Sequence, residues 1–326
     1  MKLFRNCGNF FLGLPAFVWL LIFYALPAIV VFFIAFKPVD SNGGIGDGWT
    51  LRAIQELKDP SYPAIMWRTF WQGIVSTFVC IAVSIPICYQ LARIPSVKIK
   101  NFFLLLIVVP FWTNFLIRIY AWKVFLHPDG PFKHLLVWMG VIPQSTMLLY
   151  NQWAVLAVMI YTYIPFAVLP IYSVAEKFDF SLLDAAKDLG ASSFYAFRKV
   201  FLPGISKGVL TAVMVVLIPA FGAYLIPDLV GGKDSHLVGD MIARRVFVDR
   251  NLPHASALSA VLMIAVFLPL VAFIWFRKIF GSKSPDGDLK LQLKQQDTKQ
   301  RLGSSLVFTP DTNVSQNQQK GEEANE

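Results

Sequence analysis

Few residues in this sequence are suited to chemistry, and the most conspicuous of them lie together near the middle of the chain. The stretch DAAKDLGASSFYAFRKVFLPG, residues 184–204, is charged and amphipathic, whereas long runs of Leu, Ile, Val and Phe flank it on both sides. Its charged residues are Asp184, Lys187, Asp188, Arg198 and Lys199. The question that this stretch raises is whether it catalyses a reaction or binds a partner.

Motifs for catalysis or metal binding do not emerge elsewhere. The glycine-rich run GGIGDGWT, residues 43–50, lacks the lysine of a nucleotide-binding P-loop and is typical of a turn. His127 and His134 are seven residues apart in a segment typical of a solvated loop, and Cys80 and Cys88 lie in an apolar run where we expect buried, reduced thiols. We therefore expect no catalytic residue, no metal and no cofactor, and any driving energy must come from another chain.

The composition indicates a membrane protein. Of the 326 residues 56% are hydrophobic and only 15% are charged, whereas soluble domains carry about 25% charged residues. The mean hydropathy is +0.57. The net charge of +9 is scattered between apolar runs and forms no patch, which argues against nucleic-acid binding. The apolar run at 10–36 is too long for a signal peptide and predicts an uncleaved first span.

We predict an all-α polytopic membrane protein with six transmembrane helices, because a helix satisfies its own backbone in lipid and a span needs about 20 apolar residues. The predicted spans are Leu12–Phe36, Gly73–Ala92, Phe102–Trp122, Trp153–Val174, Gly208–Ile226 and Ala255–Phe276. Residues 1–280 then form a transmembrane domain. Residues 281–326 are polar, and we expect a disordered cytoplasmic tail.

The connecting segments predict the orientation. Residues 93–101 contain three basic residues and no acid, and the N-terminal segment contains Lys2 and Arg5. By the positive-inside rule, the N-terminus, the 93–101 loop, the charged middle segment and the C-terminus are cytoplasmic.

The middle segment has the pattern of two short helices joined at a glycine. Ser181 and Asp184 are spaced as a capping box, and Gly190 stands where a helix C-cap places a left-handed residue. The expected apolar face of the first helix comprises Leu182, Ala185, Ala186 and Leu189, and that of the second comprises Phe194, Phe197 and Phe201, with Pro203 at its end. An amphipathic helix lying on lipid is the alternative. Such helices favour basic residues on their polar face, whereas this one has two aspartates and one lysine, which favours a groove on a protein partner.

The same spacing resembles a known family. The loop motif of ABC importer permeases is E-A-A-x3-G-x9-I-x-L-P. This chain has a similar pattern with the same spacings, formed by Asp184-Ala185-Ala186, Gly190, Val200 and Leu202-Pro203. This chain departs from the motif at two positions, where Asp184 replaces Glu and Val200 replaces Ile. In that family the loop docks onto the nucleotide-binding subunit, so the resemblance implies this role for residues 184–203 and implies the ABC importer permease fold.

Three further stretches look like the spermidine and putrescine permeases: VPFWTNFLIRIYAW at 109–122, PIYSVAEK at 170–177 and IPDLVGG at 226–232. The segment at 249–259 departs from the usual form, because Leu252 stands where an aromatic residue is usual. The resemblance implies a permease that moves polyamines inward in the bacterial inner membrane, using ATP hydrolysed by a separate ABC subunit. It also implies a second, homologous permease and an external substrate-binding protein as partners.

Other transport classes compete with this interpretation. An importer for an amino acid, iron or an anion would share the docking loop. A six-span ion channel would need a selectivity filter or spaced arginines, and neither occurs here. A proton- or sodium-coupled carrier usually needs acids within its spans, and the six predicted spans hold none.

Trp112, Asn114 and Arg118 in the third predicted span are our candidates for the translocation path. An aromatic face can hold an ammonium weakly, at about 0.5 to 2 kcal/mol, and Trp112 lies in mid-span beside Pro110. Tyr120 and Trp122 are more typical of an interfacial belt. Because an arginine in the path would repel a polyamine, we expect Arg118 to face a carbonyl group or the interface.

Overall fold

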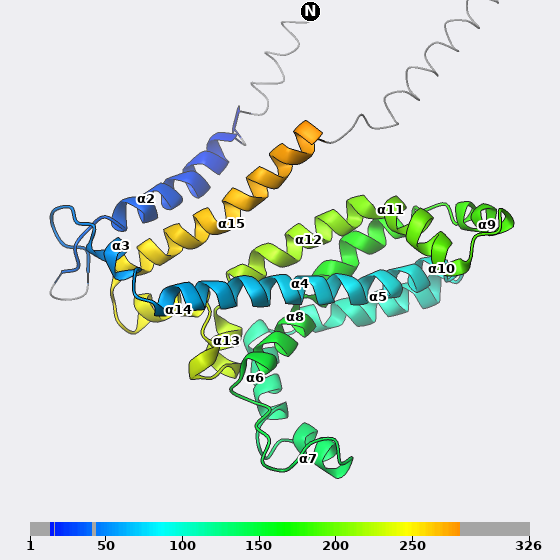
Figure 1. The fold of residues 1–326 in the computed structure, drawn as a ribbon, viewed down its shortest axis with the longest axis horizontal. Helices are drawn as coiled ribbons and strands as arrows, with labels where there is room; N and C mark the ends of the chain where they lie inside the picture. Colours follow the sequence, from blue (N-terminus) through cyan, green and yellow to red (C-terminus); the bar gives the residue numbers. More distant parts are fainter. Residues whose placement is uncertain (1–13, 16, 41–43, 281–326) are drawn as a thin grey trace, which may run out of the picture. The chain divides into compact units, whose positions relative to one another are not determined.

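The computed structural model describes residues 14, 15, 17–40 and 44–280, which are helices and their connections (Figure 1). Two compact units divide the chain, Met1–Val266 and Phe267–Glu326, and each is considered by itself. Cys7 and the predicted tail at 281–326 lie outside the described residues.

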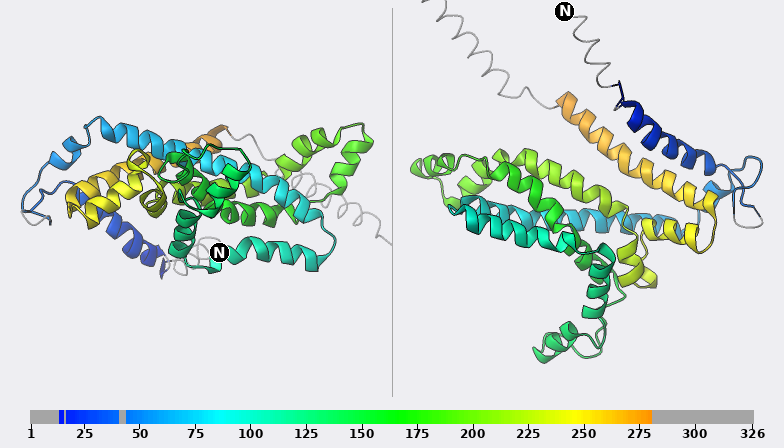
Figure 2. Two further views of the ribbon diagram at one scale, coloured as in Figure 1. Left: turned by 90° about the horizontal axis from the view of Figure 1, so that it is seen from below. Right: turned by 180° about the vertical axis from the view of Figure 1, so that it is seen from behind.

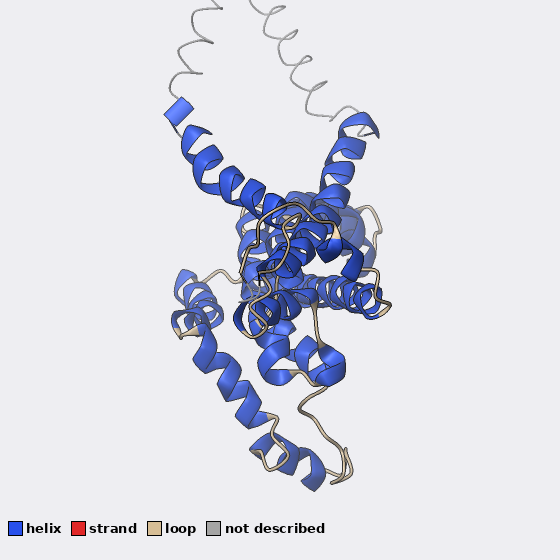
Figure 3. Cartoon of the chain, turned by 90° about the vertical axis from the view of Figure 1, so that its left-hand side faces the viewer, coloured by secondary structure: helices blue, strands red, loops and turns tan. Residues whose placement is uncertain are grey.

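Helices are the regular elements throughout this part, and the segments between them are loops and turns (Figure 3). A π-helical turn at Leu21–Ala25 precedes the first labelled helix, and another at Phe197–Phe201 joins two others. In chain order the α-helices are α2 (Leu26–Ile34), α3 (Arg52–Glu56), α4 (Ser61–Arg93), α5 (Val97–Trp112), α6 (Phe115–Phe125), α7 (Pro131–Trp138), α8 (Gln152–Ala175), α9 (Ser181–Asp188), α10 (Ser193–Ala196), α11 (Leu202–Gly204), α12 (Ser206–Phe221), α13 (Leu225–Val230), α14 (Val238–Phe247) and α15 (Leu252–Phe280).

The helical membrane class is confirmed, and the predicted spans need two corrections. In the described residues, three helices are long and apolar enough to cross a membrane: Phe17–Ile34, Ser61–Arg93 and Gln152–Ala175. Two sharply bent helix pairs bring the number to five if each pair is one span, and α15 adds a shorter apolar helix at Leu252–Leu268.

The third predicted span is broken. α5 ends at Trp112 and α6 begins at Phe115, with a bend of 94° between them. Thr113 has extended backbone, and the side chain of Asn114 accepts a hydrogen bond from the Leu116 amide at 2.8 Å, so it caps a new helix. The apolar run continues across this point, which is why composition predicted one helix.

The fifth predicted span, Gly208–Ile226, is also interrupted. α12 ends at Phe221, and residues 222–224 separate it from α13. Pro219 lies in the last turn of α12, where it removes an amide donor, and Gly222 is its C-cap residue. The chain therefore leaves the helix within the predicted span.

The centre of the fold is the pair of helices α4 and α8. Side chains of α4 donate hydrogen bonds to backbone carbonyls of α8 from Gln72 to Gln152 (3.4 Å), from Cys80 to Ile160 (3.5 Å) and from Cys88 to Val168 (3.5 Å). Each acceptor follows its donor by 80 residues, so the two helices run parallel and in register. Cys80 and Cys88 are buried and free, as predicted.

Small side chains permit this close approach. Gly73, Ser76, Cys80, Ser84 and Cys88 recur about every fourth residue along α4 and are buried. In lipid, where apolar burial does not drive helix association, small residues let helices approach closely and gain van der Waals contact. Because α4 and α8 are parallel, the chain must return between them, and α5 begins this return after a short turn at 94–96.

The third member of the central group is α12, which packs on both α4 and α8 (Figure 2). A Cβ atom at Gly208 would lie 2.8 Å from the Pro170 carbonyl oxygen and 3.0 Å from Val174. At the other end, a Cβ at Gly73 of α4 would lie 2.6 Å from the Phe221 ring. Glycines thus set the separation of the three helices.

Replacing Gly208 by valine should push α12 away from α8, because the obstructing atom is a backbone carbonyl that cannot rotate aside. We expect a loss of about 1 to 3 kcal/mol, typical of overpacking, seen as a lower melting temperature of the purified protein in detergent. Gly222→Ala is the control, since the nearest atom to its Cβ is 3.9 Å away. Equal melting temperatures for the two variants would contradict the packing.

Candidate functional site

The charged stretch forms a compact elbow of α9, α10 and α11, but its start differs from the predicted capping box. The Asp179 carboxylate accepts a hydrogen bond from the Ser181 amide at 3.0 Å and so caps α9. Ser181 is already the first residue of the helix, and Asp184 pairs with Lys187 at 3.3 Å. The predicted Ser181–Asp184 capping box is therefore wrong, because the cap lies two residues earlier.

Gly190 has a φ of +87°, as its position after the helix predicted. Its amide donates to the Lys187 carbonyl at 2.8 Å, and the Ala191 amide donates to the Ala186 carbonyl at 3.0 Å, which satisfies two terminal carbonyls of α9. A Cβ at Gly190 would meet no atom within 4 Å. The requirement for glycine thus comes from the backbone conformation and not from crowding.

The predicted apolar face of α9 is exposed in this chain. Leu189 is 90% exposed and Leu182 is 51% exposed, whereas Leu183, which the pattern did not select, is buried. Ala185 is exposed and Ala186 half-buried. The helix is therefore held by Leu183, and its apolar side faces outward without a partner among the residues that the structure describes.

The second predicted face divides between the interior and the surface. Phe201 is fully buried, whereas Phe194 is 74% exposed, so the three phenylalanines do not form one buried stripe. Pro203 was expected to end the second helix. Instead it lies in α11, before a bend of 67° that leads into α12. Val200 and Leu202 are half-buried at this bend.

Aromatic rings attach the elbow to the end of α4. The Tyr89 ring lies 4.9 Å from the Phe201 ring and 5.1 Å from the Phe197 ring, measured between centroids. The Arg93 guanidinium lies 5.9 Å from the Phe180 ring centre. The 93–101 loop and the charged segment, predicted to share one side of the membrane, therefore lie side by side (Figure 1).

An ion pair lies beside this attachment and joins α5 to the end of α8. Lys100 of α5 lies 2.8 Å from the carboxylate of Glu176, the C-cap residue of α8, which also accepts a hydrogen bond from the Tyr172 hydroxyl at 2.9 Å. The Lys100 hydrogen bond, and then that of Tyr172, lower the pKa of Glu176. The elbow thus contacts the end of α4 directly, and the helix that leads into it is tied to α5.

The three path candidates do not form one cluster. Trp112 is 80% exposed at the end of α5, and Asn114 serves as the cap of α6. The Arg118 guanidinium lies 5.3 Å from the Phe111 ring centre and 5.7 Å from that of Phe115. Arg118 therefore contacts two aromatic rings, and its expected place at a carbonyl group or at the membrane interface stays a prediction. It lines a pocket of about 340 Å³ with Ala121, Trp122, Phe125 and Tyr161.

A polar cluster that sequence reasoning missed joins α3, α4, α14 and α15. The buried His254 ring lies 2.8 Å from the Tyr62 hydroxyl and 2.9 Å from the Glu56 carboxylate. Arg245 donates to Tyr62 at 3.0 Å and to Asp249 at 2.8 Å. Glu56 and His254 are 198 residues apart, so no local motif could have indicated their contact.

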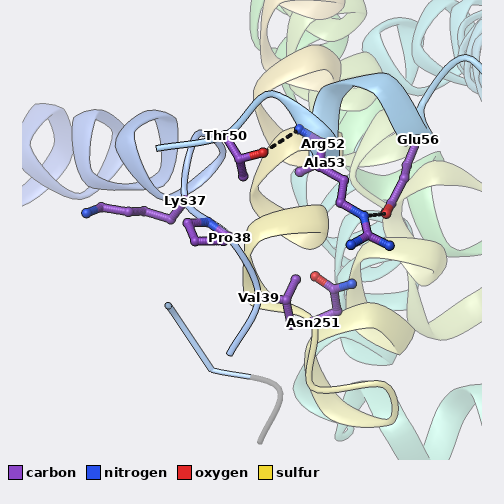
Figure 4. Close-up of a pocket in the computed structure, with 8 residues that line it drawn as sticks. All are labelled: Lys37, Pro38, Val39, Thr50, Arg52, Ala53, Glu56 and Asn251. Carbon is purple, nitrogen blue, oxygen red and sulfur yellow. Dashed lines mark hydrogen bonds and ion pairs between the residues drawn. The ribbon is translucent and has the colours of Figure 1, made fainter. Parts of the chain in front are cut away.

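A pocket of about 370 Å³ adjoins this cluster (Figure 4). Arg52 and Glu56 of α3 form an ion pair at 3.2 Å on one side of it, and Asn251 approaches from the start of α15. Lys37 also lines this pocket. The arrangement ties the segment after α2 to the segment before α15.

A second missed acid is Asp240 of α14. Its carboxylate lies 2.6 Å from the His236 ring and accepts a hydrogen bond from the Leu237 amide at 2.7 Å. Burial raises the pKa of Asp240 in spite of these two bonds. Among the residues that the structure describes, no three His, Cys, Asp or Glu side chains are grouped as metal ligands.

Comparison with known proteins identifies a family of transport components and relatives that are similar over most of the chain. Residues 60–284 match the family described as "Binding-protein-dependent transport system inner membrane component". The spermidine/putrescine transport system permease protein PotB of Haemophilus influenzae is 34% identical over 277 residues, which cover 85% of this chain and 96% of that protein. PotB of Escherichia coli strain K12 is 33% identical over 265 residues, 81% of this chain and 96% of that protein.

A solved structure shares the fold. It is a bacterial ABC transporter involved in the import of the acidic polysaccharide alginate, and its chain aligns with a TM-score of 0.64 at 17% identity. The alignment covers 86% of this chain and 100% of that chain. At this identity the likeness concerns the fold alone.

Replacing Glu176 by glutamine tests the ion pair between α5 and the end of α8, beside the elbow. A carboxylate whose pKa is lowered in the folded state stabilises the fold at pH values above its unfolded pKa, about 4.3, and loses that effect as the pH falls through the lowered value. We expect Glu176→Gln to melt at a lower temperature than wild type at pH 7, and the difference to shrink below about pH 4. Asp188→Asn, an exposed acid on the same elbow, is the control. A difference that does not depend on pH would exclude the ion pair as its source.

Proposed function

The chain belongs to the family of binding-protein-dependent transport system inner membrane components, and from this premise we propose that it is the permease subunit of an ABC importer for polyamines. The observation that carries the substrate is the 34% identity to a spermidine/putrescine permease over 96% of that protein's length. The transported ligands are putrescine or spermidine, moved inward across the bacterial inner membrane. A separate ABC subunit hydrolyses the ATP.

The elbow supplies the docking surface for that ATP-binding subunit. Leu182 and Leu189 on α9 have exposed apolar side chains, whereas Leu183 and Phe201 are buried and belong to the main hydrophobic core. An apolar helix face that fits a groove on a partner is a standard recognition mode. The motif residues Asp184, Ala185, Ala186, Gly190, Val200, Leu202 and Pro203 shape this surface and its bend into α12.

The contact with Tyr89 allows movement of the docking surface to reach the membrane helices. Movement of the elbow is passed to the end of α4, because aromatic packing joins them, and the Lys100–Glu176 ion pair links α5 to the end of α8, just before the elbow. The bend at Pro203 passes the same movement to α12. On this proposal the elbow is cytoplasmic, and so are the N- and C-termini.

The remaining partners follow from the transporter class. A second, homologous permease covers part of the exposed apolar surface of this chain, and an external binding protein delivers the polyamine and sets selectivity. A solved relative in fold was crystallised with a periplasmic protein bound to an alginate pentasaccharide. Trp112, Asn114 and Arg118 stay candidates for the path, with Asn114 at the α5–α6 break as the best placed.

Uptake of labelled putrescine and spermidine by cells that express the whole complex tests this proposal. Wild type should take up a polyamine in an ATP-dependent manner. Gly190→Val should reach the membrane yet lose uptake and substrate-stimulated ATP hydrolysis, because a β-branched residue costs about 1 kcal/mol or more at positive φ. Gly190→Asn is the matched control, since asparagine tolerates that conformation.

Two results would contradict the proposal. Uptake of an amino acid or an anion without uptake of either polyamine would refute the substrate. Normal coupling of uptake to ATP hydrolysis in Gly190→Val would refute the role of the elbow.

A further inference from the structure

Two helix breaks meet beside the middle of α8. The first separates α5 from α6 at Thr113 and Asn114, and the second separates α12 from α13 at residues 222–224. α13 packs against both α6 and α8, and Tyr163, midway along α8, donates its hydroxyl proton to the Pro219 carbonyl of α12 at 3.2 Å. Interrupted helices that meet at mid-membrane are where transporters place substrate sites, because unwound backbone can line a cavity there.

A pocket of about 150 Å³ lies at this junction, which we name the junction pocket. Phe115, Tyr163, Tyr224 and residues 219 and 222–226 line it. No lysine, arginine or histidine is among these residues, and the Tyr163 proton is already donated to Pro219. The pocket therefore offers aromatic faces and oxygen acceptors and has no cationic side chain in its lining, which suits a cation better than an anion.

The charges around the junction pocket also favour a cationic ligand. The C-terminal end of α12, which carries partial negative charge, ends at Phe221 beside the pocket. The N-terminal end of the shorter α13 carries partial positive charge, but its first turn contains the acidic residue Asp228. Asp228 lies one turn beyond Tyr224, and its amide donates a hydrogen bond to the Tyr224 carbonyl at 3.2 Å. Asp228 is exposed and does not line the pocket, so its carboxylate can attract a cation toward the pocket from one helical turn away.

One nearby cation acts against the site. Arg118 lies over the Phe115 ring at 5.7 Å, so that face is already occupied by a guanidinium. Asp240 is bonded to His236 and to the Leu237 amide and does not compensate for Arg118. Tyr163 and Tyr224 are therefore the rings left for a ligand, and the repulsion by Arg118 keeps binding weak, as release to the other side requires.

We propose that the junction pocket holds a primary ammonium group of the substrate during translocation, against the rings of Tyr224 and Tyr163 and with Asp228 at its entrance. This inference rests on the proposed function, since it assigns a place in the path to one end of a polyamine. The methylene chain of the substrate would lie along the apolar lining at 225 and 226.

Substitution of Tyr224 tests the proposal in the complete importer. Tyr224→Leu removes the ring, and uptake of labelled putrescine should fall about tenfold, which corresponds to ~1.4 kcal/mol and to one cation–π contact. Tyr224→Phe keeps the ring and should stay within about twofold of wild type, since the face is retained. The assembled complex should purify in the same amount from both variants, whereas a misfolded chain would fail to assemble. Wild-type uptake by Tyr224→Leu would overturn the proposal.

Thiol labelling gives a second test that does not depend on transport. A cysteine at Gly222 would fit, because the nearest atom to a Cβ there is 3.9 Å away. Gly222→Cys should react preferentially with an ethylammonium thiosulfonate over the anionic sulfonatoethyl reagent. The ratio of the two rates should exceed by about tenfold the same ratio at Gly44→Cys, where a Cβ meets nothing within 4 Å. Putrescine should slow the reaction at Gly222→Cys alone.

The two tests separate the possible failures. If the wild-type complex carries no polyamine, the proposed function is wrong, yet a preference of Gly222→Cys for the cationic reagent would still support an ammonium site. If polyamine uptake is normal and the labelling ratio equals that at Gly44→Cys, the junction pocket is not the site while the transporter assignment stands.

Discussion

The close, parallel contact between α4 and α8 is the constraint on which the other features depend. Three side chains of α4 reach carbonyls of α8 at one constant offset of 80 residues, and this is possible only because small residues line α4. Because these helices are parallel, the chain must turn back after α4, and α5 begins this return. α12 then packs against both α4 and α8. The positions of the elbow and of the junction pocket both follow from where the chain turns around this pair.

Hydrogen bonding from glutamine and cysteine side chains of α4 to carbonyls of α8 fits a helix pair in lipid. Apolar surface gains nothing there by leaving water, so short polar contacts and close van der Waals packing hold the helices together. Residues at the ends of the pair behave differently. At one end, Tyr89 contacts the elbow through ring packing, and Lys100 forms an ion pair with Glu176 at the end of α8. At the other end, Tyr62, Glu56 and His254 form a hydrogen-bonded cluster near the start of α4.

The exposed apolar side chains of the elbow are as informative as its buried ones. Leu183 and Phe201 bury themselves within the elbow, while Leu189, one residue before the turn at Gly190, is almost fully exposed. A lone soluble protein would gain by covering such a residue, since burial of a leucine side chain is worth about 1.5 to 3 kcal/mol. On our proposal the ATP-binding subunit covers it, and the fold holds the side chain ready for that contact.

The sequence predicted the helical class, the family and the glycine turn, because each depends on local composition or on spacing along one helix. Gly190 is an example, since its left-handed backbone follows from its place after an amphipathic helix. The sequence did not reveal the breaks at Asn114 and at residues 222–224, because apolar residues continue through both. Contacts such as Tyr163 with Pro219, or Glu56 with His254, join distant segments that carry no shared pattern.

Capping at the elbow shows the limit at short range. Ser181 and Asp184 have the right types and spacing for a capping box, but Asp179 competes for the same amide and occupies it. Leu183 is buried in place of Leu182 because the helix is rotated by its attachment to Phe201 and its neighbours, which the periodicity of one short helix cannot specify. Both errors arise where tertiary contacts choose between local alternatives of similar energy.

The most direct test of the account is whether the exposed face of α9 contacts the ATP-binding subunit. Leu189→Cys in the assembled importer, treated with a short cysteine-to-lysine cross-linker, should join this chain to that subunit, and mass spectrometry should locate the product. Tyr150→Cys, on a connecting segment outside the elbow, should give no such product. A complex that co-purifies intact but yields no cross-link from Leu189→Cys, or an equal one from Tyr150→Cys, would contradict the account.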